Sequence, residues 1–184
     1  FPTKVMTTGE GGMIVTNNYS LYKKMKSLKN FGRSSNPLIL NNIGMNYKIS
    51  EFNSSLGMLE LDRVDSRIKK RNNLVQLYDS ELSKENFEVL LQKEGLSCHY
   101  KCIVKTSIPY VRIKNKLNKN GISLTGKVWE MPIHKQNIFI KNNLIDKLSF
   151  KNAENFAKEH FCPPNYPELK LQEAEKICRI LNTL

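Results

Sequence analysis

Apolar residues recur at helical spacing through the middle of the chain. Ser50 suits an N-cap, and Phe52, Leu56 and Leu59 follow three or four positions apart. The apolar stripe continues as far as Leu82. This pattern predicts one very long helix, or two helices in series.

The remaining segments are shorter. Met13–Thr16 is a brief apolar run behind a glycine cluster, which favours a strand, and residues 29–47 form a long polar segment that predicts a loop. Weak alternation predicts a strand over 98–105, and residues 122–129 are expected to be extended. Helices are predicted over 19–28, from Pro109 through Leu117, over 152–161 and over 171–181.

A concentration of charged residues near the middle of the chain predicts a domain boundary. Residues 63–71 form a charge-rich stretch of the long helix, and we place the boundary at about residue 72. Residues 73–184 have the mixture of strands and helices expected of a small α+β domain. Residues 1–72 are then the end of a different domain.

Composition narrows the possible partners. Lys and Arg number 29 against 17 Asp and Glu, a formal net charge of +12. Hydrophobic residues make up 40% of the chain, too many for a disordered segment. Because no run of about 18 apolar residues occurs, we expect no membrane partner. Lysine is spread along the chain, so nucleic acid is not the expected partner, although a basic helical interaction or nucleic-acid-binding module without catalysis is the alternative function.

The four cysteines do not form a metal motif. No CxxC pair occurs among Cys98, Cys102, Cys162 and Cys178. Cys162 and Cys178 also do not supply a second pair of metal ligands to accompany the first two cysteines. We therefore expect buried free thiols in a reducing cytoplasm and no metal site.

The densest candidate chemistry lies at the start of the chain. Lys4 precedes a cluster formed by Gly9, Gly11 and Gly12. A Walker loop would need its lysine after the glycines, and a dinucleotide-binding fingerprint would lead into a helix. What remains is a lysine beside a tight glycine turn, whose amine could form a Schiff base with a carbonyl.

Several spaced segments together resemble one enzyme family. The chain is similar to the DegT/StrS family of nucleotide-sugar aminotransferases, which use pyridoxal 5′-phosphate (PLP) and have PLP fold type I. The resemblance covers essentially the whole chain and rests on Lys4 with Thr7–Asn17, Lys29–Gly32, Gly44–Glu51 with Leu56–Leu61, Gly121–Ile122 with Pro132–Gln136, and Cys162–Pro167.

The resemblance implies an α/β fold and a set of roles. Residues 1–72 would be the incomplete end of an aspartate aminotransferase-like large domain, and 73–184 the small C-terminal domain. Lys4 matches the catalytic lysine that holds PLP, and Asn46 matches a residue that reaches the PLP phosphate of the neighbouring subunit in a homodimer. His134 matches a residue near the sugar. The implied reaction transfers an amino group, with glutamate as the expected donor, to a nucleotide-linked keto sugar for amino-sugar or surface polysaccharide biosynthesis.

The chain also departs from the family pattern. Lys29 and Lys48 stand where the family usually has Arg, and Thr125-Gly126-Lys127 replaces a Thr-Arg pair, so the charge is kept but the bidentate geometry of arginine is lost. A complete relative is about twice as long, and Phe1 is the only trace of the residues that normally precede the lysine segment. We therefore expect a C-terminal portion that is inactive alone.

Overall fold

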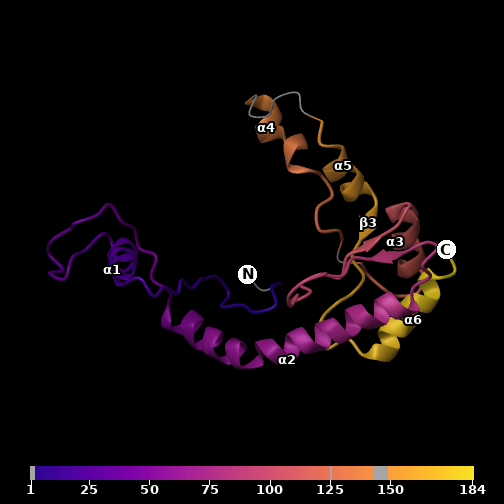
Figure 1. Ribbon diagram of the computed structural model, residues 1–184, viewed down its shortest axis with the longest axis horizontal. Coiled ribbons are helices and arrows are strands. Elements are labelled where there is room, and N and C mark those ends of the chain that lie inside the picture. Colours follow the sequence, from indigo (N-terminus) through magenta and orange to yellow (C-terminus); the bar gives the residue numbers. More distant parts are fainter. Residues whose placement is uncertain (1–2, 125, 143–148) are drawn as a thin grey trace. The chain divides into compact units, whose positions relative to one another are not determined.

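A computed structural model describes residues 3–124, 126–142 and 149–184 (Figure 1). Phe1 and Thr125, which entered the sequence predictions, lie outside these residues. By its contacts the chain divides into two compact units, Phe1–Val64 and Asp65–Leu184. The division falls within one long helix, and the domain boundary at about residue 72 stays a prediction.

Two predicted helices are confirmed, one within the first unit and one that begins in the first unit and continues into the second. Helix α1 spans Tyr19–Leu28, and the side chain of Asn18 caps it by accepting a hydrogen bond from the Leu21 N–H at 3.0 Å. Helix α2 spans Glu51–Glu81 without interruption, so the prediction of one very long helix holds and that of two helices in series is wrong. The Ser50 hydroxyl accepts a hydrogen bond from the Asn53 N–H at 3.2 Å, as expected for its N-cap.

The predicted strand over Met13–Thr16 is wrong. These residues carry no strand, and the Met13 and Val15 side chains are 88% and 85% exposed. A strand needs a neighbour for its ladder of hydrogen bonds, and no described segment of the chain pairs with this one. An apolar run alone is therefore not sufficient to predict a strand.

The second unit is built on a small antiparallel sheet. Strands β1 (Glu88–Val89), β2 (Val104–Lys105) and β3 (His160–Phe161) lie in the order β1-β2-β3. Helices α3 (Tyr110–Asn118) and α6 (Leu171–Leu181) confirm two further predictions. One contiguous core joins the sheet, these helices and the end of α2: Leu74, Val75, Tyr78, Leu82, Phe87, Val89, Cys102, Val104, Ile113, Leu117, Phe161, Leu169, Ala174, Ile177, Cys178 and Leu181.

Other predicted bounds need correction. The strand expected over 98–105 is confined to β2, and residues 122–124 and 126–129 form no strand. The helix expected over 152–161 is α5 (Lys151–Lys158), because the chain then turns to pair His160 with Lys105 in the sheet. The 3-10 helix η1 (Ile133–Lys135) and helix α4 (Asn137–Lys141) had no predicted counterpart.

Three of the four cysteines are buried free thiols, as expected, but Cys98 is exposed. The strand predicted over 98–105 would contain both Cys98 and Cys102, but residues 98–103 are not in a strand. Among the described residues, no helix combines the length and apolarity needed to cross a bilayer. Within the same residues no group of three or more His, Cys, Asp or Glu is placed to hold a metal ion.

Candidate functional site

Lys4 lies in an exposed bend at the start of the glycine segment. The turn that follows is fixed locally, since the Thr7 hydroxyl accepts a hydrogen bond from the Gly9 N–H at 3.0 Å. Gly9 has φ +79°, a conformation that glycine adopts without the strain of a side chain. The segment is further held by Asn53 of α2, whose side-chain amide donates to the Glu10 carbonyl at 2.9 Å.

Missing side chains let this segment approach α2 closely. A Cβ added to Gly57 would lie 2.9 Å from the Thr8 methyl carbon, and one added to Gly11 would lie 2.9 Å from Ile49 Cδ1. Gly57 is buried although it lies within a helix, where glycine lowers stability. The small residues on the first turns of α2 thus allow the close packing that fixes the segment behind Lys4.

Asn46 lies on a short antiparallel pairing of two motif segments. Backbone hydrogen bonds of 3.0 Å run from the Phe31 N–H to the Met45 carbonyl and from the Tyr47 N–H to the Lys29 carbonyl, and Asn30 and Asn46 form a bridge. The Asn46 side chain is exposed. The predicted long loop is therefore an ordered hairpin-like turn that presents this amide at its edge.

Two glycines make this pairing possible. Gly32 is buried with φ +75°, and a Cβ there would lie 1.7 Å from the Asn42 carbonyl oxygen. A Cβ on Gly44 would lie 2.3 Å from the Gly32 nitrogen. The neighbouring Phe31 adopts φ 59°, a conformation that costs a non-glycine residue free energy. Both glycines belong to the motif segments. Their backbone contact explains physically why glycine is needed at these two positions.

His134, the third predicted site residue, belongs to the second unit and lies in η1. Its side chain is 11% exposed, its Nε2 lies 3.1 Å from Glu154 Oε1, and its ring centroid lies 4.7 Å from that of Phe150. The Lys135 ammonium donates to the other Glu154 oxygen at 2.6 Å. A single carboxylate of α5 therefore orients the histidine.

Glu154 also determines which nitrogen of His134 carries a proton. Hydrogen bonds from Lys135 and then from His134 lower the pKa of the Glu154 carboxyl, so it is ionised and can only accept. His134 Nε2 must then donate. When the ring is neutral, Nδ1 is the nitrogen left to accept a hydrogen bond.

Lys127, at the position where the family pattern changes, has a structural role. Its ammonium donates to the carbonyls of Ala157 and Lys158 at 2.6 and 3.0 Å, where it caps the C-terminus of α5. Burial lowers the pKa of this amine. The charge is thus engaged by the C-terminus of the helix whose first turn carries Glu154.

Sequence reasoning missed His160. Its side chain is 1% exposed, its Nε2 accepts from the Val128 N–H at 3.0 Å, and its Nδ1 donates to the Phe156 carbonyl. Burial lowers its pKa, and the charges of Lys127 and Lys101 lower it further. The sequence signal that could have found it is the apolar pair Phe161-Cys162 directly after His160, which is typical of a buried strand.

The described residues fit part of a PLP site. Lys4 and Asn46 both lie in the first unit, and His134 lies in the second. A primary amine is the group that PLP needs for attachment, and an amide N–H on an ordered turn suits a phosphate oxygen. The donor set of the first unit therefore fits the cofactor's attachment and phosphate contact.

Comparisons with known proteins all lead to aminotransferases. The model of the DegT/DnrJ/EryC1/StrS aminotransferase family matches residues 1–182. A UDP-4-amino-4,6-dideoxy-N-acetyl-beta-L-altrosamine transaminase of Campylobacter jejuni is 26% identical over 183 residues, which cover 95% of this chain and 48% of that protein.

Solved structures give the same result. Helicobacter pylori PseC, an aminotransferase involved in the biosynthesis of pseudoaminic acid, superposes with TM-score 0.82 and 25% identity over 97% of this chain and 50% of its own. The PLP form of a putative sugar aminotransferase from Streptococcus pneumoniae shares the fold, with TM-score 0.76 and 21% identity over 94% of this chain and 45% of that one. The chain spans about half the length of the relatives it matches. Its sequence and its mixed α/β fold place it in the DegT/DnrJ/EryC1/StrS aminotransferase family.

Proposed function

We propose that this chain is the C-terminal portion of a PLP-dependent aminotransferase. The complete enzyme transfers an amino group from glutamate to a nucleotide-linked keto sugar, in the cytoplasm, for amino-sugar or surface polysaccharide biosynthesis. The observation that carries the proposal is Lys4 at the head of a glycine segment packed on α2, within a family match over residues 1–182. The names of relatives, which are transaminases of nucleotide-linked sugars, support the substrate class.

Each residue has a defined task in this proposal. The Lys4 amine would hold the cofactor and, once the amino donor displaces it, would move a proton between the donor Cα and C4′ of the cofactor. The Asn46 amide donates to a phosphate oxygen, and in a homodimer it does so across the subunit boundary. His134, fixed by Glu154, offers Nδ1 to a sugar hydroxyl. When bound, PLP supplies the electron sink that makes the donor C–H bond acidic.

Exposed apolar side chains on α2 support assembly with further protein surface. Phe52 is 89% exposed, Leu56 39% and Leu59 56%, and their spacing of three or four residues places them on one face of the helix. Exposed apolar surface of this kind marks a protein interface. A homodimer of the complete enzyme would cover it.

Amino transfer measured with the complete enzyme tests the assignment of Lys4. We expect Lys4→Ala to abolish transfer from glutamate to a nucleotide-linked keto sugar, because residues 3–17, the glycine segment, contain no other lysine. Lys114→Ala, an exposed lysine of α3, is the matched control and should keep normal turnover. Normal turnover in the Lys4→Ala enzyme would refute the proposal.

The 184-residue chain alone should not hold PLP productively. After addition of PLP, we expect no stable absorbance band at about 400–430 nm, the region typical of lysine-linked PLP. A stable band that disappears in Lys4→Ala would show that the portion suffices for attachment, contrary to this expectation.

A further inference from the structure

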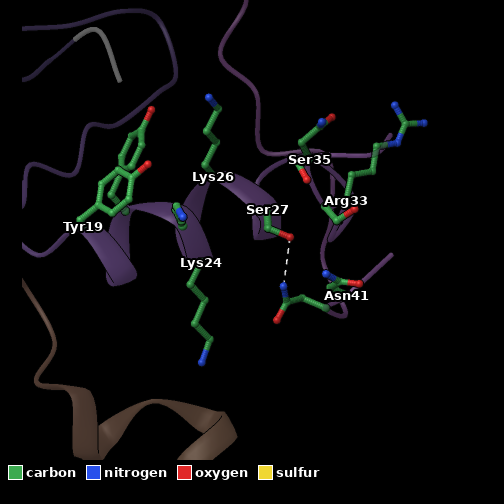
Figure 2. A pocket seen from close by; sticks show the side chains of 12 residues that line it. Tyr19, Lys24, Lys26, Ser27, Arg33, Ser35 and Asn41 are labelled. Carbon is green, nitrogen blue, oxygen red and sulfur yellow. Dashed lines mark hydrogen bonds between the residues drawn. The ribbon is translucent and has the colours of Figure 1, made fainter. Parts of the chain in front are cut away.

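Lys127 differs from the exposed lysines of the chain. Lysines on a surface helix usually extend into solvent, as Lys24 and Lys26 do on opposite sides of α1 (Figure 2). The Lys127 ammonium instead donates to the carbonyls of Ala157 and Lys158 at 2.6 and 3.0 Å. Burial lowers the pKa of this amine, and burying a charged group costs free energy unless its hydrogen bonds compensate. These two bonds to the end of α5 therefore determine where the side chain lies.

The backbone around Lys127 is fixed from other parts of the second unit. The Lys101 ammonium donates to the Lys127 carbonyl at 2.7 Å, and the Val128 N–H donates to His160 Nε2 at 3.0 Å. The Lys127 ammonium also lies 5.1 Å from the ring centroid of Tyr110 in α3. Lys127 is thus held independently of α5 and offers a fixed point to which the end of that helix attaches.

Helix α5 depends on such an attachment. It has only eight residues, and isolated helices shorter than about 12–15 residues are marginal in water. Its N-cap residue is Phe150, whose side chain cannot accept a hydrogen bond from the first turn. Of residues 151–158, all of which the structure describes, Ala157 alone is buried. The Lys127 ammonium gives a partner to two carbonyls that the helix itself leaves unpaired, and it places a positive charge at the negative end of the helix dipole.

The first turn of the same helix contacts His134. Glu154 Oε1 lies 3.1 Å from His134 Nε2, and Glu154 Oε2 accepts from the Lys135 ammonium at 2.6 Å. Because the ionised carboxylate can only accept, it keeps the His134 proton on Nε2. Glu154 precedes Ala157 by three residues, which is less than one helical turn. Loss of the helical conformation at the end of α5 would therefore release the carboxylate that orients the histidine.

We propose that Lys127 is a positioning residue for His134 and acts through α5. By capping the end of the helix it keeps the helix folded, the helix holds Glu154, and Glu154 fixes the tautomer and the orientation of the His134 ring. The inference rests on the proposed function only for the consequence of this position, which is the contact between His134 Nδ1 and a sugar hydroxyl.

Nitrogen NMR of the His134 ring in the full 184-residue chain tests the positioning without any catalysis. Lys127→Met keeps the apolar stem and removes the ammonium, so it should shift both ring nitrogens toward the values of exchanging tautomers. Lys127→Arg keeps a cationic donor and should keep the native values. Lys114→Met, at an exposed position of α3, is the control with the same loss of charge and should leave the His134 nitrogens unchanged.

A helix-stabilising substitution shows whether the effect passes through α5. Asn152→Ala/Asn155→Ala replaces two exposed residues of the helix by the residue with the highest helix propensity. Added to Lys127→Met, this double substitution should restore the native nitrogen shifts. Native shifts in Lys127→Met alone, or no restoration by the two alanines, would overturn the proposal. If circular dichroism shows that Lys127→Met does not fold, the milder Lys127→Gln takes its place, with the same expected direction.

Kinetics of the complete enzyme separate this inference from the proposed function. Lys127→Met should raise KM for the nucleotide-linked keto sugar at least about threefold and leave KM for glutamate within about twofold. Shifted nitrogens with an unchanged KM for the sugar would support the positioning by Lys127 and refute the sugar contact of His134. A complete native enzyme without amino transfer would refute the proposed function, and the nitrogen shifts would still decide the positioning.

Discussion

Replacement of His160 by Phe should destabilise the second unit most strongly at neutral and alkaline pH. The substitution keeps an aromatic ring beside Phe156, whose ring centroid lies 4.3 Å from that of His160. It removes both ring nitrogens, so the Val128 N–H and the Phe156 carbonyl lose their partners. Because an unsatisfied buried polar group costs about 1–3 kcal/mol, the two lost partners should together cost about 2–6 kcal/mol at about pH 8.

The pH dependence follows from the lowered pKa of His160. Burial holds this pKa below the ordinary value of 6.5, so the unfolded chain binds more protons than the folded chain between the two values. Stability of the native protein therefore falls as pH decreases through that window, by up to about 1.4 kcal/mol per pH unit for one proton. The Phe variant lacks this proton uptake, so its deficit relative to the native protein should shrink as the pH falls.

Urea unfolding followed by circular dichroism, repeated from about pH 8 to pH 5, measures both effects. His99 also has a pKa lowered by burial, but it is present in both proteins and cancels in the difference. A deficit that stays constant across this range would refute the argument from proton linkage. A deficit below about 1 kcal/mol at pH 8 would refute the hydrogen-bond argument.

Three further substitutions test the local geometry. Glu154→Gln should let His134 exchange between its two neutral tautomers, seen in the nitrogen chemical shifts of the ring, whereas Glu154→Asp should keep the proton on Nε2. Tyr78→Phe should lower the free energy of unfolding by about 1 kcal/mol in urea titrations, because the buried hydroxyl donates to the Pro164 carbonyl at 2.8 Å. Gly32→Ala should abolish the backbone pairing that carries Asn46, seen as faster exchange of the Tyr47 amide proton, because a Cβ would lie 1.7 Å from a carbonyl oxygen.

Helices with a clear apolar stripe were predictable from sequence. Helices α1 and α6 have the predicted bounds, and α2 follows the pattern that begins at Ser50. Such helices satisfy their own backbone hydrogen bonds, so the local sequence pattern contains most of the information needed to locate them. The Met13–Thr16 segment is the contrasting case, since a strand depends on a partner that the pattern does not reveal.

The candidate site was predictable only in part. The motifs identified Lys4, Asn46 and His134 as residues of interest, but their roles stay predictions. The pairing of residues 28–31 with 45–47 could not be predicted, because these segments are too short to show a strand pattern and their contact depends on two glycines meeting backbone to backbone. The cap that Lys127 provides for α5 was also hidden, since it joins residues thirty positions apart.

The two units differ in how they are stabilised, and this bears on the chemistry. The second unit encloses a contiguous core that includes Tyr78, Phe161 and Leu181, each 0% exposed. In the first unit α1 has no buried residue, and Phe52 on α2 is 89% exposed. Burial of apolar surface is the main favourable term in folding, so the unit that carries Lys4 and Asn46 has little of it within its own described residues. The positions of that amine and that amide should therefore be fixed by further protein surface packed on α2, and a proposed catalytic lysine becomes effective only in that assembly.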